Sequence, residues 1–394
     1  MKVVHVYRTY FPDPPGGLQE AIRQIALSTR ARGVEVRVLT LSPTPEPENI
    51  EFAEGRVVRA KSWAAPASCD LGGLDALMKY RKMADWADVV HFHFPWPFAD
   101  LLHLIAGKNK PTVMTYHSDI VRQKALGAVY APLMRRTLRS MSAVVATSPT
   151  YARTSETLAS CVSKERLHAI PLGIVDYRDE SRPANALRDI EQRLGLGQGE
   201  PYFLSLGVLR YYKGLHTLIE AARHVNAKIV IAGSGPERER LAALAQQNGA
   251  TNVIFAGQVT HAEKVALLNG CRALVLPSHL RSEAFGMVLV EAEMFGKPMV
   301  CCEVGSGTSY VNEDGVTGFV VEPESPLACA GAMNQLIADP QLAGRMGLAA
   351  RARYEALFSG EALGRAYEAL YRRVTAGVNE REVEREIPER NRKD

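Results

Sequence analysis

Two carboxylates lie eight residues apart in the segment SHLRSEAFGMVLVE, residues 278–291. Glu283 follows a strand-like run, Gly286 permits close backbone approach, and Glu291 falls about one turn into the next helix-like run. This arrangement offers one carboxylate to sugar hydroxyls, helix-start amides to phosphate, and a second carboxylate to a ribose diol. The alternative, two solvated surface acids, fits poorly with apolar neighbours such as Phe285.

Two cations stand in the segment SLGVLRYYKGLHTLI, residues 205–219. A strand-like run ends at Gly207 and a helix begins near Gly214, so Arg210 and Lys213 lie in the loop between them. Such a pair can neutralise a departing diphosphate, the task that a metal performs in enzymes that hold it between paired aspartates. No Asp-x-Asp occurs in the sequence, so we expect chemistry without a metal. A solvated basic loop is the alternative.

The first half offers a histidine and a glycine pair. His117 directly follows the strand-like run Thr112–Tyr116, so it should lie at a sheet edge, where it can donate a hydrogen bond to a substrate hydroxyl. Gly16 and Gly17 precede a helix-like run and would let backbone amides approach a bulky ligand. A structural histidine and a plain turn remain open as alternatives.

Two further patterns carry less information. His91 and His93 flank Phe92 on one face of a strand, but without an acidic or cysteine partner nearby we favour packing or substrate contact over metal binding. Gly233-Ser234-Gly235 is half of a dinucleotide-binding fingerprint, because the third glycine and the ribose-binding acid are absent.

Alternating strand-like and helix-like runs must position these residues. The alternation occurs twice, and it is typical of parallel sheets with crossover helices, so we predict an α/β fold of two doubly wound, Rossmann-like domains with ligand loops at the carboxyl ends of the strands. The predicted strands are Val3–Tyr7, Val34–Leu39, Val89–Phe92, Thr112–Tyr116 and Ala143–Thr147, then Tyr202–Leu206, Lys228–Ala232, Val253–Ala256, Ala273–Leu276 and Met299–Cys302. The predicted helices include Leu18–Arg32, Gly214–Val225, Glu237–Asn248, Ala262–Asn269 and Val288–Phe295.

The domain boundaries follow from composition. Arg182-Pro183 and the glycine-rich residues 195–199 mark a junction, and residues 379–394 are so charged that no apolar face survives. We therefore predict an N-terminal domain at residues 1–175, a linker at 176–200, a C-terminal domain at 201–358, a helix at 359–376 and a disordered tail at 377–394.

Composition also indicates the compartment. The 394 residues are 46% hydrophobic and 23% charged, as in soluble globular proteins. No apolar run is long enough to cross a bilayer, the first apolar segment lacks a cleavage-like site, and the six cysteines form no C-x-x-C pair. We expect a cytoplasmic protein.

The positive charge is concentrated in the first half. Residues 1–175 hold 22 Lys and Arg against 15 Asp and Glu, a balance of +7, whereas the remainder holds 25 against 28, a balance of −3. This is too little for a nucleic-acid partner, but it suits an anionic membrane surface or phosphorylated substrates. We expect peripheral membrane association, with a solvated helix face as the alternative, through Arg122, Lys124, Arg135, Arg136 and Arg139 beside Leu133, Met134 and Leu138.

Several motifs together resemble a known family. The glycine pair after the first strand, GVLRYYKGL, IAGSGPERERL, FAGQV, SEAFGMVLVEAEMFGKPMV and DGVTGFVVEP are similar to those of GT-B glycosyltransferases of family 4, which are retaining and use sugar nucleotides. The resemblance covers roughly residues 1–375. The opening MKVVHVYRTYFPDPPGG and the RYYKG loop look most like bacterial mannosyl- and D-rhamnosyltransferases of lipopolysaccharide O-chain assembly. It implies a GT-B fold, in which two Rossmann-like domains face each other across a cleft.

The resemblance also implies roles for individual residues. Glu283 and His117 would contact the transferred sugar, Glu291 the ribose hydroxyls, and Arg210 and Lys213 the diphosphate. Phe285, Gly286 and Met287 would line the sugar and phosphates, Gly16 and Gly17 would lie beneath the donor, and the loop from Gly257 to Val259 would frame the base. Two positions depart from the family pattern: Val208 stands where an arginine is usual, and Gly305-Ser306-Gly307 replaces a Gly-Gly pair.

We interpret the chain as a metal-independent retaining hexosyltransferase without a cofactor. It would move mannose or D-rhamnose from a GDP-sugar to a sugar hydroxyl of a polyprenyl-diphosphate-linked or oligosaccharide acceptor. The departing phosphate would help to deprotonate that hydroxyl, so no protein base is assigned. The rival interpretations are a sugar-nucleotide hydrolase or epimerase on the same scaffold, a non-catalytic scaffold, and an NAD-dependent oxidoreductase, which the incomplete glycine fingerprint disfavours.

Overall fold

The computed structural model describes residues 1–13, 16–65, 69–106, 110–119, 124–178 and 185–386. The chain divides into two compact units. One consists of Met1–Val175 together with Gly360–Asp394, and the other of Asp176–Ser359. The C-terminal segment therefore returns to the unit in which the chain began.

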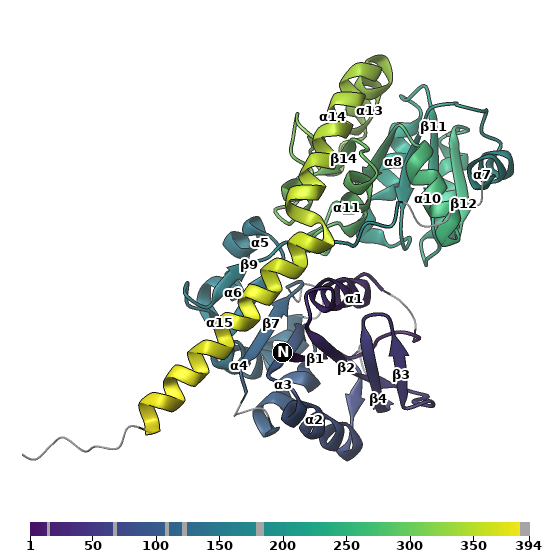
Figure 1. Cartoon of the computed structure of the whole chain (residues 1–394). Helices are drawn as coiled ribbons and strands as arrows, with labels where there is room; N and C mark the ends of the chain where they lie inside the picture. The colour runs from purple at the N-terminus through teal and green to yellow at the C-terminus, as the bar shows by residue number, and fades with distance from the viewer. Residues whose placement is uncertain (14–15, 66–68, 107–109, 120–123, 179–184, 387–394) are drawn as a thin grey trace, which may run out of the picture. The chain divides into compact units, whose positions relative to one another are not determined.

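The described residues of the first unit form a nine-stranded sheet around a parallel centre (Figure 1). The order is β3-β4-β2-β1-β6-β7-β8-β9, with β5 paired to β4. Its central strands read as continuous apolar runs because helices cover both faces of a parallel sheet. Strand β2 pairs with β1 on one side, and β6 pairs with β1 on the other side. The direction in which the chain builds the sheet therefore reverses between β1 and β6. The strands are β1 (Lys2–Val6), β2 (Glu35–Ser42), β3 (Asn49–Phe52), β4 (Gly55–Ala64), β5 (Leu71–Gly72), β6 (Val89–Phe94), β7 (Thr112–Tyr116), β8 (Ala143–Ala146) and β9 (Leu167–Ala169).

Helix α15 (Gly360–Glu386), at the yellow end of the colour scale, packs against α1 (Gly17–Arg30) in this unit (Figure 1). A Cβ on Gly364 would lie 2.3 Å from the carbonyl oxygen of Ser28, so glycine is required for this close approach. The helix continues past residue 376, so the prediction that residues 377–394 lack structure was wrong for 377–386. Residues 387–394 lie outside the described part. The other helices are α2 (Leu74–Trp86), α3 (Pro97–Ala106), α4 (Lys124–Ser140), α5 (Pro149–Thr154) and α6 (Glu156–Cys161).

The second unit contains a six-stranded parallel sheet with the order β12-β11-β10-β13-β14-β15. Its winding reverses between β10 and β13, the position where ligands bind in open α/β sheets. The predicted linker contains a helix, α7 (Ala186–Leu194). The strands are β10 (Tyr202–Leu206), β11 (Lys228–Ala232), β12 (Val253–Gly257), β13 (Ala273–Leu276), β14 (Met299–Cys302) and β15 (Gly318–Val321).

Helices on both faces bury this sheet. The cluster between the sheet, α8 and α13 includes Phe203, Leu218, Ile231 and Met333, all fully buried. The helices are α8 (Leu215–Ala222), α9 (Arg238–Gln247), α10 (His261–Gly270), α11 (Met287–Met294), α12 (Thr308–Val311), α13 (Pro326–Ala338) and α14 (Pro340–Arg353), with short turns at Tyr211–Lys213 and Tyr354–Phe358. Among the described helices of both units, none is long and apolar enough to span a membrane.

Candidate active site

Lys213 and Glu283 form an ion pair at the carboxyl end of the second sheet. Lys213 comes from the loop after β10 and Glu283 from the loop after β13, so the pair lies where the winding of the sheet reverses. The hydroxyl of Ser278 also donates to Oε2 of Glu283, at 3.2 Å. Both charged side chains are largely buried, with 14% and 11% of their surfaces exposed. A partly desolvated charge pair of this kind can hold a polar, charged ligand.

Lys213 keeps its charge although it is enclosed. Burial acts to lower the pKa of its amine, but Glu283 and the neighbouring Tyr212 together outweigh this effect, and the net pKa is raised. The amine also lies close to Gly207, since a Cβ on that residue would be 4.0 Å from Nζ. An ammonium group has three N–H donors, and one of them donates to Oε2 of Glu283, which leaves two for a phosphate oxygen.

The loop of Glu283 is supported by the Gly305-Ser306-Gly307 segment. The Ser306 hydroxyl donates to the carbonyl oxygen of Glu283 at 2.6 Å, and the amide of Gly307 donates to that of Ala284 at 2.8 Å. A Cβ on Gly307 would lie 2.7 Å from the ring of Phe285. The sequence departure noted at residues 305–307 therefore has a structural role, which is to hold the Glu283 loop.

Gly286 and Met287 begin α11. Gly286 has a φ of +86°, in the region that glycine favours, and it directs the chain into the helix. Met287 is half-buried. Phe285 was expected to line the ligand, but its ring is 4% exposed and packs edge-on against Phe358, with centroids 6.1 Å apart. Its side chain therefore belongs to the core of the unit.

One oxygen of Glu291 is already occupied. Oε1 accepts from the Tyr177 hydroxyl at 2.8 Å and from Nζ of Lys264 at 2.6 Å. These two partners fix the carboxylate, and Oε2 has no hydrogen-bond partner among the described residues. A diol could therefore bind at Oε2. Tyr177 and Lys264 were not identified from the sequence, because neither belongs to a recognisable pattern with Glu291.

The remaining candidates of this unit lie on neighbouring loops. Arg210 is exposed and makes no ion pair with any residue in the described ranges, and Val208 is 48% exposed. Gly257 and Val259, after β12, are half-buried. The carbonyl oxygen of Gly257 accepts from the amide of Gly233 at 2.7 Å. Arg210 and the 257–259 loop thus stand apart from the hydrogen bonds of the Lys213–Glu283 pair.

The half-fingerprint at residues 233–235 has a packing role. A Cβ on Gly233 would lie 2.0 Å from the carbonyl oxygen of Gly207, and a Cβ on Gly235 would lie 2.5 Å from that of Leu209. Both glycines also have positive φ. They allow the loop after β11 to pack directly on the loop that leads to Lys213.

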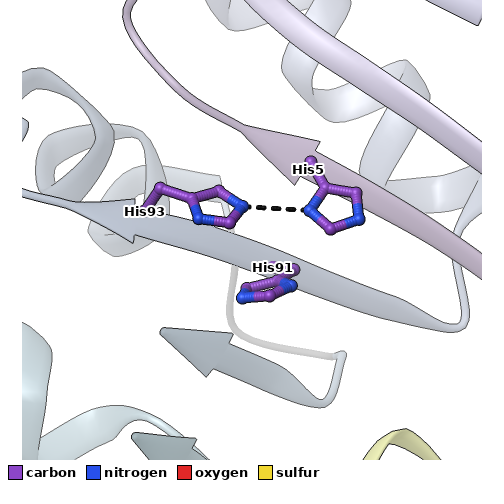
Figure 2. A group of neighbouring side chains, drawn as sticks. All are labelled: His5, His91 and His93. Carbon is purple, nitrogen blue, oxygen red and sulfur yellow. Dashed lines mark hydrogen bonds between the residues drawn. The ribbon is translucent and has the colours of Figure 1, made fainter. Parts of the chain in front are cut away.

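His117 in the first unit ends a chain of buried histidines, of which Figure 2 shows His5 and His93. Nε2 of His117 lies 3.0 Å from Nδ1 of His93, and Nε2 of His93 lies 2.9 Å from Nδ1 of His5. Burial lowers the pKa of His117 and of His5 to about 3 and that of His93 well below its usual value. The three imidazoles are therefore neutral at physiological pH. Within the described residues, Nδ1 of His117 has no hydrogen-bond partner, so it can face a substrate.

His91 lies beside this chain, and the rings of His5, His91 and His93 could together surround a metal ion (Figure 2). Hydrogen bonds already use the nitrogens of His91, since Nδ1 pairs with the Tyr371 hydroxyl and Nε2 with the Thr115 hydroxyl, both at 2.7 Å. Nδ1 of His5 and Nε2 of His93 also pair with each other, at 2.9 Å. The group is thus explained as a buried hydrogen-bond network, in line with the packing role favoured from the sequence.

Gly16 and Gly17 form the start of α1. Gly16 is the N-cap residue in an extended conformation, and Gly17 is the first helical residue. A Cβ on Gly17 would have no atom within 4 Å, whereas a Cβ on Gly16 would lie 2.6 Å from Oε1 of Gln19. The amides of a helix start are thus present at this loop, although Pro14 and Pro15 lie outside the described residues.

Comparison with known proteins identifies the class. Residues 16–173 match the glycosyl transferase 4-like domain and residues 188–353 match glycosyl transferases group 1. The structure superposes on that of sucrose-phosphate synthase from Thermosynechococcus elongatus with a TM-score of 0.78 at 24% identity, over 95% of this chain and 99% of that one. It also superposes on HepE of Anabaena in complex with UDP, with a TM-score of 0.75 at 20% identity, over 94% and 99%. The fold is that of the GT-B glycosyltransferases.

Two relatives are much more similar in sequence. A D-rhamnosyltransferase of Pseudomonas aeruginosa, WbpZ, is 44% identical over 91% of this chain and 92% of that protein. An O-antigen chain mannosyltransferase of Escherichia coli is 39% identical over 94% and 98%. The chain therefore belongs to the group 1 (family 4) glycosyltransferases, and it is an enzyme that transfers a glycosyl group.

Proposed function

We propose that this enzyme is a retaining hexosyltransferase of cell-surface polysaccharide synthesis. It takes mannose or D-rhamnose from a GDP-sugar and transfers it to a sugar hydroxyl of a polyprenyl-diphosphate-linked or oligosaccharide acceptor. The names of the two similar relatives support the choice of sugar and pathway. The observation that carries the chemistry is the buried Lys213–Glu283 pair at the reversal point of the second sheet. The rival activities, hydrolase, epimerase and oxidoreductase, gain no support from the relatives.

The proposed mechanism depends on stabilising the departing diphosphate. Glycosyl transfer passes through an oxocarbenium-like state, so charge develops on the phosphate oxygen as the bond to the sugar breaks. The Lys213 ammonium and the amides at the start of α11 would bind that charge, while Glu283 would hold hydroxyls of the sugar. The departing phosphate would accept the proton of the attacking hydroxyl on the same face of the sugar. No metal and no protein base are required in this scheme.

His117 would orient the transferred sugar from the first unit. Its Nδ1 is the ring atom left for a sugar hydroxyl, because Nε2 is held by His93. Gly16 and Gly17 would provide amides beneath the donor. Glu291, fixed by Tyr177 and Lys264, would bind the ribose through Oε2. Base recognition is assigned to the loop from Gly257 to Val259.

Donor and reaction can be tested together. Purified protein is mixed with GDP-mannose, GDP-D-rhamnose and UDP-sugars, and release of nucleoside diphosphate is followed with and without a lipid-linked acceptor. We expect acceptor-dependent release from a GDP-sugar that persists in excess EDTA. Equal release without acceptor would identify a hydrolase instead, and loss of turnover in EDTA that Mg²⁺ restores would refute the metal-independent scheme.

The enzyme is also proposed to work at the inner face of the cytoplasmic membrane. Arg135, Arg136 and Arg139 are exposed on α4. Leu138, however, is fully buried, so it is not part of an exposed apolar face as the sequence interpretation required. Leu133 and Met134 are half-buried, Arg122 lies outside the described residues, and the side chain of Lys124 is not described either.

Other exposed apolar side chains support a membrane-binding face. They lie on α2, α3 and α4, three helices that pack successively against one another. Exposed apolar side chains together with exposed arginines suit an anionic bilayer surface, because each basic residue contributes about 1 kcal/mol there. The residues are Leu74 and Met78 on α2, Leu101 and Ile105 on α3, and Val129 on α4.

Vesicle sedimentation tests this proposal. We expect salt-sensitive binding to anionic vesicles that is weakened when Arg135, Arg136 and Arg139 are replaced by Gln, and a further loss with Met78→Ser and Ile105→Ser. Equal, negligible sedimentation with anionic and neutral vesicles would contradict the membrane role while leaving the transfer reaction intact.

A further inference from the structure

Three side chains that the transfer reaction does not use come together in the second unit. They are His216 in α8, His279 in the loop after β13 and Glu324 in the loop after β15. One possible ligand atom from each lies within 4.8 Å of the others. The cluster therefore joins elements that follow three different strands of the sheet.

His279 is buried without hydrogen-bond partners on its ring. The residue is 8% exposed, and neither Nδ1 nor Nε2 has a partner among the described residues. A buried polar atom without a partner costs about 1–3 kcal/mol, so such a ring needs an explanation. Burial and the neighbouring His216 lower the pKa of His279, although Glu324 opposes them. The imidazole is therefore neutral at pH 7 and carries a free lone pair.

Glu324 is held in an unusual backbone conformation. Its φ is +56°, and in the described part of the chain it is the one residue other than glycine with a positive φ. A residue with a side chain in this region carries a conformational cost of about 1 kcal/mol or more, and such residues cluster at functional sites. Its carboxylate is exposed, so it can turn toward the two imidazoles without first losing a buried partner.

Two imidazoles and a carboxylate are a ligand set that Zn²⁺ prefers. Tetrahedral coordination at about 2.1 Å needs ligand atoms about 3.4 Å apart, which side-chain rotation of Glu324 and of the half-buried His216 can provide. We propose that His216, His279 and Glu324 form a binding site for one divalent transition-metal ion, Zn²⁺ by preference, with a water molecule as the fourth ligand.

The proposed ion would act on the loop that carries Lys213. The backbone amide of His279 donates to the carbonyl oxygen of Tyr212 at 3.1 Å. A Cβ on Gly214, the residue after Lys213, would lie only 3.3 Å from Nδ1 of His279. The ring of Tyr211 packs against both imidazoles. An ion here would tie this loop to the ends of β13 and β15, which is a structural role separate from the Lys213–Glu283 pair and from turnover.

Metal binding can be measured directly on untagged protein. Calorimetric titration with Zn²⁺ should give one ion per chain, and binding should raise the Tm because the ion binds only the folded state. His216→Ala and Glu324→Gln should each weaken binding at least tenfold, and His279→Ala should abolish it. His224→Ala, which removes an exposed histidine of the same unit, is the matched control and should bind as the parent does.

A spectroscopic measurement keeps the test valid if the variant at the buried His279 does not fold. Co²⁺ in place of Zn²⁺ should give the intense visible bands of a tetrahedral site, and these should be lost in His216→Ala. Because His216 is only half-buried, circular dichroism of this variant should match that of the parent. No Zn²⁺ binding by the parent would overturn the proposal. Binding that is the same in the parent, His216→Ala and Glu324→Gln would also overturn it, because it would place the ion elsewhere.

Discussion

Nε2 of His117 lies 3.0 Å from Nδ1 of His93, and this contact determines which ring nitrogen of His117 remains for a ligand. A neutral imidazole has one N–H and one lone pair, so the protons along His5, His93 and His117 must all point the same way. Nε2 of His5 is buried without a partner, and an unpaired lone pair is tolerated there better than an unpaired N–H. The protons therefore sit on Nδ1 throughout the chain, and His117 presents an N–H donor.

The first prediction is that His93→Phe lowers kcat about tenfold or more with a smaller change in KM for the donor. The substitution removes the partner that fixes the tautomer of His117. The proton of His117 can then move from Nδ1 to Nε2, and the N–H donor toward the substrate is lost in part of the molecules. ¹⁵N spectra of histidine-labelled parent protein should show Nε2 of His117 unprotonated. His103→Gln, at a buried histidine that pairs with Ser140 instead, is the control. A protonated Nε2 in the parent would disprove the assigned tautomer.

The second prediction is that the buried histidines make the first unit less stable in acid. His5 and His117 have folded-state pKa values of about 3, against about 6.5 in the unfolded chain. The unfolded chain binds more protons between these values, so stability is fully present above pH 6.5 and falls as the pH is lowered. Each such histidine contributes up to about 1.4 kcal/mol per pH unit. The Tm should fall between pH 7 and pH 5, and it should fall less steeply in His5→Gln than in the parent. Identical slopes of Tm against pH in the two proteins would argue against the buried histidines as the cause.

The third prediction separates the two cations of the loop after β10. Lys213→Ala should reduce kcat at least a hundredfold, because its buried ammonium is assigned to the departing diphosphate. Arg210→Ala should reduce it far less, because Arg210 is exposed and stands outside the ion pair. The Tm of both single variants shows whether a loss of activity comes from a loss of stability. The double variant Lys213→Ala/Glu283→Gln is the further control, because it also removes the carboxylate that Lys213→Ala leaves buried without its partner. Comparable losses in rate for the two single variants would show that Arg210 serves as the family arginine absent at Val208.

Local pattern was enough to find most of the parallel strands but not the contacts of the site. Both ends of β10, β11 and β13 coincide with the predictions, because these are short apolar runs bounded by glycine or a loop and buried on both faces. Strand β4 and the two strands that pair antiparallel with it, β3 and β5, were missed. The edge strand β3 alternates exposed and half-buried residues and lacks the continuous apolar run. The boundary at residue 175 agrees with the division of the chain, whereas the return of α15 to the first unit depends on its packing with α1.

The site residues were found one by one, and their partners were not. Lys213 and Glu283 are seventy residues apart, and His5 and His93 eighty-eight. Such pairs are created when parallel strands align their carboxyl ends, so no spacing in the sequence signals them. The burial of the Phe285 ring could not be foreseen for the same reason, because it depends on Phe358 from a distant turn.

The fourth prediction concerns Glu291 and the residues that fix it. Glu291→Gln should weaken binding of free nucleoside diphosphate about tenfold with little effect on kcat at saturating donor, whereas Glu283→Gln should chiefly lower kcat. Tyr177→Phe should weaken nucleotide binding less, because Lys264 still holds Oε1 at 2.6 Å. Calorimetric titration measures the affinity of each variant for free nucleoside diphosphate directly. Unchanged nucleotide affinity in Glu291→Gln would exclude it as the ribose ligand.

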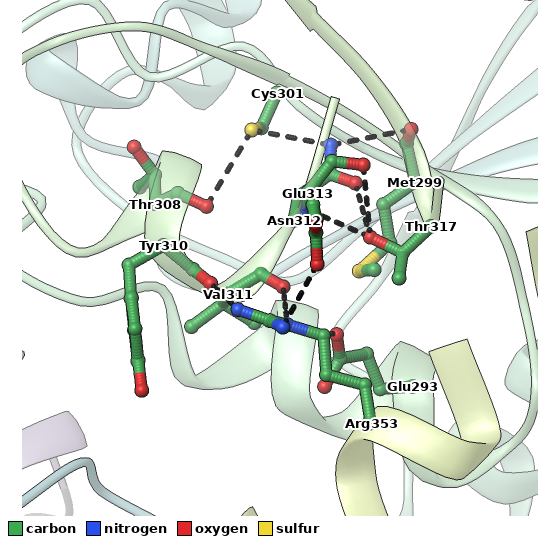
Figure 3. Close-up of polar contacts among 10 residues, drawn as sticks. All are labelled: Glu293, Met299, Cys301, Thr308, Tyr310, Val311, Asn312, Glu313, Thr317 and Arg353. Carbon is green, nitrogen blue, oxygen red and sulfur yellow. Dashed lines mark hydrogen bonds and ion pairs between the residues drawn. The ribbon is translucent and has the colours of Figure 1, made fainter. Parts of the chain in front are cut away.

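The last prediction concerns Glu293, which is fully buried two residues after Glu291 (Figure 3). Arg353 approaches it at 3.9 Å but directs its N–H groups elsewhere, to the carbonyl oxygens of Val311 and Tyr310 and to Glu313. Burial raises the pKa of Glu293 to about 9, with Arg353 opposing the shift. The folded protein therefore keeps a proton that the unfolded chain loses near pH 4.5.

Stability must then fall as the pH rises from about 4.5 to 9, by up to about 1.4 kcal/mol per pH unit from this one group. Glu293→Gln removes the titration and keeps the shape, so its Tm should exceed that of the parent by several degrees at pH 8 and by much less at pH 5.5. Glu313→Gln, which removes the exposed carboxylate beside the same arginine, is the control and should show no such gain. A Tm difference between Glu293→Gln and the parent that is independent of pH would mean that Glu293 is ionised in the folded protein.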